Sequence, residues 1–248
     1  MAPLFSIITV TYNASGTIGA TLDSIAAQSC TLYEVILQDG ASTDDTLAHV
    51  NACAIDPARL KVESKPDAGI YHAMNRALER ATGDYVIFLN AGDTLHSPST
   101  LQLIADAVMD NDYPGVAYGQ TVLVDAGRRY VGHRHLSAPE ELTVDSFKQG
   151  MLVCHQAFVV LRKLTAPYDT RYRLSADYDW CIRCLQRSRR NLYIPHVIID
   201  YLSEGMTTRN RRRSLLERYR IMCRYYGIVP TTLRHIKFAL RFLKSKKR

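Results

Sequence analysis

The sequence predicts an α/β protein with a mainly parallel, mixed sheet flanked by helices and followed by a basic helical tail. In the first part of the chain, β-rich apolar runs alternate with helical patterns at the spacing of βα units. Polar residues follow directly on three of these apolar runs. Residues 209–248 hold 14 of the 31 Lys and Arg residues but one of the 24 acidic residues, so this segment carries +13 and the rest of the chain −6.

The first part of the chain is expected to form four strands separated by helices. Ile18, Leu22 and Ile25 recur at helical spacing, and Ser15 is expected to cap that helix at its start. In sheets of this kind, ligands bind beyond the carboxyl ends of the strands. The expected strands are residues 5–11, 33–38, 60–63 and 84–89, and the expected helices are residues 15–28, a short helix ending at 49, and residues 70–81.

Beyond residue 99 the regular alternation weakens, and no clear linker separates the two halves of the chain. The pattern there predicts antiparallel strands between two helices, and then one more apolar strand. The expected helices are residues 101–109 and 176–187, and the expected strands are residues 116–124, 151–160 and 193–201.

Composition is that of a globular protein, with 248 residues, 47% hydrophobic and 22% charged. The first residues lack a basic leader, and no run approaches the roughly 18 apolar residues of a spanning helix, so a cytoplasmic protein is expected. Six scattered cysteines indicate reduced thiols. Cys181 and Cys184 form a lone C-x-x-C without the second pair that zinc needs, so they are expected to be buried on a helix.

The stretch FLNAGDTL, residues 88–95, poses the central chemical question. Asn, Gly and Asp are ordinary turn residues, but here they end a buried strand. The chain has no G-x-G-x-x-G or Walker motif, so a bound phosphate would need another source of positive charge. A Mg²⁺ or Mn²⁺ ion held by Asp93 would supply it, and Asn90 could add a carbonyl ligand or bind a ribose hydroxyl. The residue chemistry alone leaves both a turn and a metal site open.

A resemblance to a known family bears on this question. Four segments come in order and at familiar spacing, and together they resemble the nucleotide-sugar half of the family 2 inverting glycosyltransferases of bacterial polysaccharide and glycolipid biosynthesis. A fifth, Ser175-Ala-Asp-Tyr-Asp-Trp180, is similar to that family's acidic catalytic segment, and the match spans about residues 4–205. The four are Phe5-Ser-Ile-Ile-Thr-Val-Thr-Tyr-Asn13, Gln38-Asp-Gly-Ala-Ser-Thr-Asp-Asp-Thr46, Asp67-Ala-Gly-Ile-Tyr-His-Ala-Met-Asn75 and Gly83-Asp-Tyr-Val-Ile-Phe-Leu-Asn-Ala-Gly-Asp93.

The resemblance implies the GT-A fold, with a glycosyltransferase domain at residues 1–208, a donor half at about 1–99 and an acceptor half at about 100–208. It implies that Asp93 binds a metal that bridges the donor diphosphate, and that Asp177 is the general base that deprotonates the acceptor hydroxyl. Asp39 would recognise the nucleotide base of the donor, and Thr11 would line the same pocket. The donor-binding residues that it implies are Thr11, Asp39, Asp67, Asn90 and Asp93.

Two departures from the family pattern concern the metal and the donor. Asn90 and Gly92 stand where the family usually has acidic residues, which leaves strict metal dependence open. His72 stands where relatives often have Asp, and it is expected on a helix surface. The positions of His155 and Gln156 resemble ones that lie near the acceptor, although the residues alone would indicate a core histidine.

Three other polar residues are expected to be structural. Asp179 points about 200° away from Asp177 on a helix, so it is expected to accept structural hydrogen bonds. His133 and His135 alternate along a strand, which could suggest a metal, but a solvent-facing strand edge is the better interpretation.

The tail, residues 209–248, is predicted to form amphipathic helices. In residues 231–248, Leu233, Ile236, Leu240 and Leu243 form an apolar stripe beside Lys and Arg residues, a pattern typical of helices on anionic membrane surfaces. Peripheral attachment to the inner face of the membrane is therefore expected, with packing on the domain as the alternative, above all for residues 215–226. No nucleic-acid partner is expected, because the rest of the chain is acidic and no binding module is recognised.

These observations predict an inverting glycosyltransferase that moves a sugar from a nucleotide-diphosphate sugar, specifically a UDP-sugar, to a hydroxyl of a saccharide or lipid-linked acceptor. The alternative is a non-catalytic nucleotide-sugar or membrane-surface binding protein with a degenerate GT-A fold, which Asn90 and Gly92 keep open. A nucleotidyltransferase is disfavoured because the loop after the first strand, residues 13–17, carries no basic residue.

Overall fold

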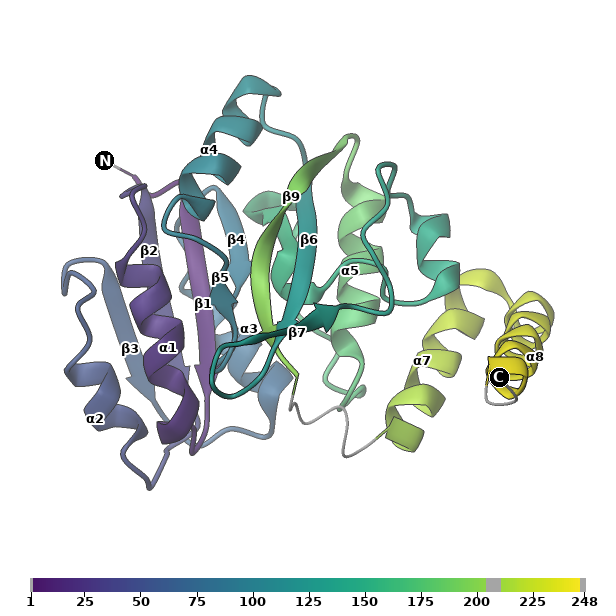
Figure 1. Ribbon diagram of the computed structural model, residues 1–248, viewed down its shortest axis with the longest axis horizontal. Helices are drawn as coiled ribbons and strands as arrows, with labels where there is room; N and C mark the ends of the chain where they lie inside the picture. Colours follow the sequence, from purple (N-terminus) through teal and green to yellow (C-terminus); the bar gives the residue numbers. More distant parts are fainter. Residues whose placement is uncertain (1, 204–210, 246–248) are drawn as a thin grey trace.

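The computed structural model describes residues 2–203 and 211–245, with the side chains of the last two helices described for residues 213–237. Within these residues one mixed sheet of nine strands runs in the order β3-β2-β1-β4-β8-β6-β9-β5, with β7 beside β6 (Figure 1). The strands are β1 (Phe5–Thr11), β2 (Tyr33–Asp39), β3 (Leu60–Ser64), β4 (Tyr85–Phe88), β5 (Thr94–Leu95), β6 (Val116–Val124), β7 (Tyr130–His133), β8 (Phe158–Leu161) and β9 (Asn191–Leu202).

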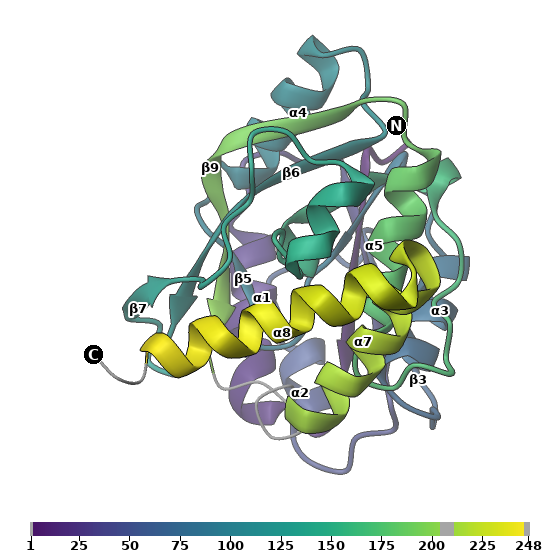
Figure 2. The same ribbon diagram turned by 90° about the vertical axis from the view of Figure 1, so that its right-hand side faces the viewer.

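Helices cover both faces of this sheet. Helix α1 lies on one face and α3 and α5 on the other, whereas α7 and α8 lie together at one end of the molecule (Figures 1 and 2). The α-helices are α1 (Ser15–Ala26), α2 (Thr46–Asn51), α3 (Ile70–Glu79), α4 (Thr100–Asp110), α5 (Ala176–Arg187), α7 (Arg211–Tyr226) and α8 (Ile228–Ser245), and the 3₁₀ turns are η1 (Val144–Gln149), η2 (His155–Ala157) and η3 (Arg162–Leu164).

The predicted parallel part of the sheet is confirmed. β1 pairs in parallel with β2 and β4, and β2 pairs in parallel with β3. Every residue of β1, β2 and β4 is buried, as expected for strands covered on both faces. Thr11 is in register with Asp39, and Asp39 with Ser64. The carboxyl ends of β1 to β4 therefore meet at one edge, named here the carboxyl edge.

Two local predictions were wrong. Ser15 is the first residue of α1 and makes no side-chain cap. The free amides there are bound by another segment, because Ser15 N donates to Asp44 Oδ2 and Ala14 N to Thr46 Oγ1. The strand expected at residues 151–160 is confined to β8, since η2 interrupts the run. Its antiparallel pairing with β6 is confirmed.

A buried carboxylate joins several elements at the opposite edge of the sheet. Glu34 Oε1 accepts hydrogen bonds from Ser6 Oγ (2.6 Å), Thr82 N (2.6 Å) and Thr82 Oγ1 (2.9 Å), and Lys61 Nζ lies 2.5 Å from Glu34 Oε2. Burial opposes ionisation of this side chain, but the bonds from Lys61, Ser6 and Thr82 prevail and lower the pKa of Glu34 to about 2. The charged form is therefore the one that stabilises the fold.

Acid should weaken the fold through Glu34. The pKa of Glu34 in the folded protein lies below the usual value of 4.5. The ionised carboxylate therefore stabilises the fold by about 3 kcal/mol above pH 4.5, and this contribution is lost as the pH falls toward 2. In urea unfolding at several pH values, Glu34→Gln should unfold more easily at neutral pH and lose less stability on acidification. Glu63→Gln is the control, because Glu63 forms a similar pair with Lys65 at a more exposed site. Equal acid sensitivity of wild type and Glu34→Gln would refute this assignment.

Helix α7 packs on the rest of the protein through buried side chains. Ile221 and Met222 are buried in the same hydrophobic core as the sheet, and Tyr226 Oη donates to Val144 O (2.7 Å). Helix α8 exposes Leu233 and Ile236. Within the described residues, no helix is long and apolar enough to cross a membrane.

Candidate functional site

The carboxyl edge holds Asp39 in a network of hydroxyl groups. Its carboxylate accepts hydrogen bonds from Ser42 N (2.9 Å), Ser42 Oγ (2.5 Å) and Ser64 Oγ (2.6 Å), and the residue is fully buried. A carboxylate offers about four lone-pair positions, so one more donor can be accepted. Asp39 therefore has a fixed orientation at the base of this edge.

Asp67 and Tyr12 lie beside the strand end that carries Asp39. A Cβ atom at Gly40 would come within 2.8 Å of Asp67 Oδ2 and 3.2 Å of Tyr12 Cδ2, so only glycine allows these two side chains to approach. Asp67 also accepts a hydrogen bond from Gly69 N (2.8 Å). Tyr12 is 65% exposed, so its ring is accessible to a ligand at the carboxyl edge.

Asp93, the candidate metal ligand, is almost completely buried just after β4. Its Oδ2 accepts from Gln156 Nε2 (2.7 Å) and its Oδ1 from Leu202 N (2.9 Å). Burial raises the pKa of Asp93 to about 7, against the opposing effects of the Leu202 amide, Gln156 and Arg128. A nearby cation would favour the ionised form.

Two buried polar atoms at the carboxyl edge make no hydrogen bond in the described structure. They are Thr11 Oγ1 and Asn90 Oδ1. Buried polar atoms are rarely left without a partner, so these two indicate a place where a ligand completes the site. Gly92 has φ 103°, and a Cβ there would lie 2.8 Å from a Leu202 methyl group. The local backbone therefore favours glycine here, and a side chain at this position would be strained.

Arg128, from the turn between β6 and β7, also reaches this loop. Its Nη1 donates to Gly92 O (2.6 Å) and its Nη2 to Thr94 Oγ1. The guanidinium thus binds the two residues that flank Asp93 in the sequence, and its positive charge favours the ionised form of Asp93. No motif marks Arg128, so sequence reasoning missed it.

Asp177, the candidate general base, lies in the first turn of α5 and is partly exposed. Its Oδ1 accepts hydrogen bonds from Tyr71 Oη (3.1 Å) and Tyr178 N (2.9 Å). Tyr71 comes from α3, whose sequence is part of the third motif, but no role was predicted for it. Burial first, and then the Asp177 charge, raise the pKa of Tyr71 well above its usual range, so this hydroxyl stays a donor.

An aromatic cluster connects Asp177 with the Asp93 side of the site. Tyr71 stacks on Tyr168 with ring centroids 5.5 Å apart, and Tyr168 Oη lies 2.7 Å from His155 Nε2. His155 is followed by Gln156, which binds Asp93. The two predicted carboxylates are thus linked by side-chain contacts from Asp177 to His155, by the peptide bond from His155 to Gln156, and by the hydrogen bond from Gln156 to Asp93.

His155 itself has the environment of a core histidine. Its ring is buried, lies 5.0 Å from the ring of Phe88 and 5.6 Å from that of Trp180, and is hydrogen-bonded to Tyr168. Burial lowers the pKa of His155 to about 4, against the opposing effect of Asp177, so the imidazole is neutral at neutral pH. The role of His155 and Gln156 on the acceptor side stays a prediction.

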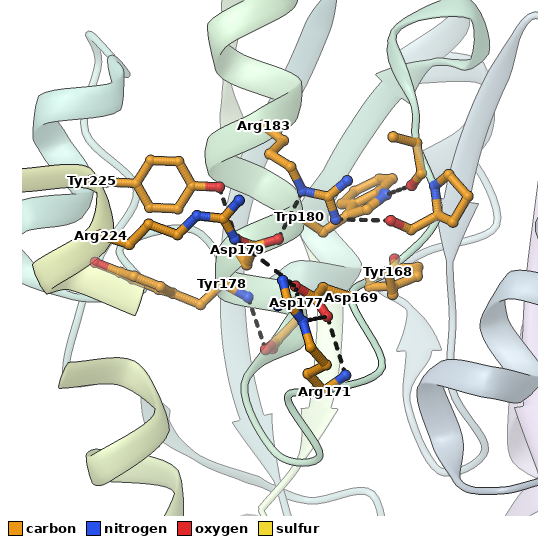
Figure 3. Close-up of polar contacts among 12 residues, drawn as sticks. Tyr168, Asp169, Arg171, Asp177, Tyr178, Asp179, Trp180, Arg183, Arg224 and Tyr225 are labelled. Carbon is orange, nitrogen blue, oxygen red and sulfur yellow. Dashed lines mark hydrogen bonds and ion pairs between the residues drawn. The ribbon is translucent and has the colours of Figure 1, made fainter. Parts of the chain in front are cut away.

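The predicted structural residues behave as expected. Asp179 is buried and bound to Arg183 and Tyr225, as Figure 3 shows beside Asp177. Cys181 and Cys184 are buried free thiols. His133 and His135 are exposed. Among the residues that the structure describes, no group of three or more His, Cys, Asp or Glu could hold a metal by itself.

Solved structures with the same architecture are glycosyltransferases of the GT-A fold. S. aureus TarS 1-349 in complex with UDP-GlcNAc superposes with a TM-score of 0.69 at 23% identity, over 90% of this chain and 64% of that chain. The mannosyltransferase PcManGT from Pyrobaculum calidifontis, in complex with GDP-Man and Mn²⁺, gives a TM-score of 0.65 at 21% identity, over 90% of this chain and 65% of that chain. The chain thus spans about two thirds of these proteins and has the GT-A fold.

Curated relatives agree in class. A PGL/p-HBAD biosynthesis glycosyltransferase of Mycobacterium tuberculosis is 36% identical over 207 residues, which are 82% of this chain and 78% of the relative. The amylovoran biosynthesis glycosyltransferase AmsB of Erwinia amylovora is 29% identical over 208 residues, 79% of this chain and 69% of the relative. The Glycosyl transferase family 2 profile matches residues 6–165. This chain therefore belongs to glycosyl transferase family 2 and is a glycosyltransferase.

Proposed function

We propose that this enzyme transfers a sugar from a UDP-sugar to a hydroxyl of a saccharide or lipid-linked acceptor, with inversion at the anomeric carbon. The observation that carries the proposal is the pair of unpartnered buried atoms, Thr11 Oγ1 and Asn90 Oδ1, at the carboxyl edge that also holds Asp39 and Asp93. The relatives named for PGL/p-HBAD and amylovoran biosynthesis support a glycolipid or polysaccharide acceptor. The UDP-GlcNAc complex of TarS supports a uridine donor.

The nucleotide base would bind between Asp39 and Tyr12. Asp39 has a fixed carboxylate that can accept one more hydrogen bond, and Tyr12 offers an exposed ring on which a base can stack. Asp67 lies beside both and would bind on the ribose side. Thr11 would line the same pocket with its free hydroxyl.

The residues at this edge fit a divalent metal, Mg²⁺ or Mn²⁺. Asp93 supplies a carboxylate with spare lone pairs, and Asn90 supplies an amide oxygen without a partner. Such ions often take one or two protein oxygens and complete their shell with phosphate and water. When bound, the ion would supply positive charge to the leaving diphosphate.

Asp177 would act as the general base. In a single displacement, the acceptor hydroxyl gives its proton to Asp177 and its oxygen forms the new bond to the anomeric carbon. The bond between that carbon and the diphosphate oxygen breaks, and UDP leaves with the electron pair. Attack from the face opposite the leaving group inverts the configuration, and the neighbouring Tyr71 holds the base in place.

Calorimetric titration tests the donor assignment. UDP should bind the wild type in the presence of Mn²⁺, and EDTA should weaken the binding. GDP and dTDP should bind more weakly, because the pocket at Asp39 is proposed to read uracil. Once a nucleotide is found to bind, the protein is assayed for transfer from UDP-sugars to lipid-linked or saccharide acceptors. Failure of every nucleotide to bind under all conditions would overturn the proposal.

The tail would attach the enzyme to an anionic membrane surface at the inner face of the membrane. Exposed apolar residues of α7 and α8 lie among basic ones, and Leu215, Leu216, Tyr219 and His235 line an apolar groove between the helices. Each Lys or Arg near such a surface contributes about 1 kcal/mol. The exposed apolar residues are Leu215, Leu216, Ile228, Val229, Leu233 and Ile236.

Flotation with liposomes tests this attachment. The wild type should float with vesicles containing anionic lipid, and less so with neutral vesicles or at high salt. The double change Leu233→Ser and Ile236→Ser, and deletion of residues 231–248, should lower the floated fraction. Val62→Ser is the control, because Val62 is an exposed apolar residue elsewhere. Equal recovery of all variants with anionic vesicles would refute the attachment.

A further inference from the structure

The single acidic residue of the basic tail, Glu217, binds the segment that leads into α5. Its carboxylate accepts three backbone hydrogen bonds, from Arg173 N (3.0 Å), Leu174 N (2.8 Å) and Ser175 N (3.0 Å). These are consecutive residues, and α5 begins directly after them. Helix α7 therefore places its one negative charge against the start of another helix.

The start of α5 has no side-chain cap of its own. Ser175 occupies the N-cap position but makes no cap hydrogen bond, and its Oγ lies 3.0 Å from Ser214 Oγ of α7 instead. Helix starts carry amides without intrahelical partners and favour negative charge nearby. Glu217 and Ser214 of α7 thus fix the three residues that lead into α5, and Glu217 places a negative charge near the start of that helix.

Asp177 follows this anchored segment by two residues. Its Oδ1 must meet Tyr71 Oη and Tyr178 N at once, so its orientation depends on where α5 begins. The negative charge of Glu217 also acts on Tyr71, the partner of Asp177. It contributes to the raised pKa of Tyr71, after burial and the larger effect of Asp177. The Glu217 contact is therefore close to the candidate base without touching it.

Helix α7 also contacts the first turn of α5, at Asp179, four residues after Ser175. Tyr225 Oη donates to Asp179 Oδ1 (2.7 Å), and Arg224 Nη1 lies 3.9 Å from the same oxygen. Figure 3 shows this contact on the same helix as Asp177. Two successive attachments leave α5 little freedom to shift or rotate relative to α7.

We propose that Glu217 is a positioning residue for Asp177, so that α7 is part of the catalytic apparatus as well as part of the tail. This inference rests on the proposed function, in which Asp177 deprotonates the acceptor. Loss of the Glu217 carboxylate frees the three backbone amides that directly precede α5 and lets Asp177 move away from Tyr71. Small displacements of a reacting group are enough to slow a reaction strongly.

Steady-state kinetics of Glu217→Gln tests the proposal. Gln keeps the size of the side chain but has one acceptor oxygen instead of two. We expect kcat to fall about 10- to 100-fold. The affinity for UDP should stay unchanged, because the hydrogen bonds that Glu217 makes in the described part of the chain go to residues 173–175 and not to the donor-binding residues. If Glu217→Gln does not fold, Glu217→Asp, which keeps the charge on a shorter side chain, should show the same division between kcat and donor affinity.

Tyr226→Phe is the matched control, because it removes a hydrogen bond between α7 and η1 and keeps the Glu217 carboxylate and its three backbone contacts. It should lower the melting temperature and keep kcat. Wild-type kcat in Glu217→Gln, together with an inactive Asp177→Asn, would overturn the inference and leave the proposed function standing. An equal loss of kcat and UDP affinity in Glu217→Gln would also overturn it, since that pattern indicates general damage to the fold. Full activity of Asp177→Asn would instead refute the proposed base.

Discussion

Asp177→Asn should abolish sugar transfer while leaving donor binding intact. Asn can still accept the hydrogen bond from Tyr71 Oη, so the fold around α5 should be preserved. It cannot take a proton from the acceptor, and loss of a general base costs about 10²- to 10⁴-fold in rate. The measurement is kcat with the best donor and acceptor, beside the Kd of UDP from calorimetry.

Asp169→Asn is the control for this prediction. Asp169 is another carboxylate, and its ionic partners are Arg171 and Arg224 (Figure 3). Its replacement should leave kcat near the wild-type value. Wild-type turnover by Asp177→Asn would assign the proton transfer to another group.

Asp93→Ala should remove metal-dependent binding of UDP. At an effective dielectric constant of about 20, a unit charge and a carboxylate about 4 Å apart interact by about 4 kcal/mol, which corresponds to roughly 10³-fold in affinity. The substitution also leaves Gln156 Nε2 and Leu202 N without their acceptor. Titration of UDP into wild type and variant, with Mn²⁺ and then with EDTA, measures the effect.

Asp84→Ala serves as the control, because Asp84 directly precedes the other end of the same strand, β4, and its side chain is exposed. It should bind UDP as the wild type does. If Asp93→Ala keeps the wild-type affinity and the same response to EDTA, Asp93 is a turn residue and the metal must bind elsewhere.

Most of the donor half could be predicted from the sequence. Strands β1, β2 and β4 are rich in apolar residues. Thr11 and Asp39 are the last residues of β1 and β2, and Asn90 follows β4 by two residues. Parallel pairing then brings these ends to one edge without any further information. The family motifs add roles to these positions, because their spacing matches the strand ends.

The later part of the chain was harder to predict. The run at residues 151–160 is apolar enough for a long strand, yet η2 interrupts it where His155 and Gln156 turn toward Tyr168 and Asp93. Side-chain partners distant in sequence decided this turn. The cap of α1 was mispredicted for the same reason, since Asp44 takes over the role expected of Ser15.

The sequence by itself determined the α/β class, the positions of the strands along the donor half, the polar carboxyl edge and the amphipathic tail, because each follows from local periodicity and strand-end chemistry. Only the tertiary structure decided which groups hold Asp177. Tyr71 lies 106 residues before it, and Glu217 binds amides 42 to 44 residues away in the sequence. Such contacts depend on how α3, α5 and α7 pack together, and no local pattern encodes that packing.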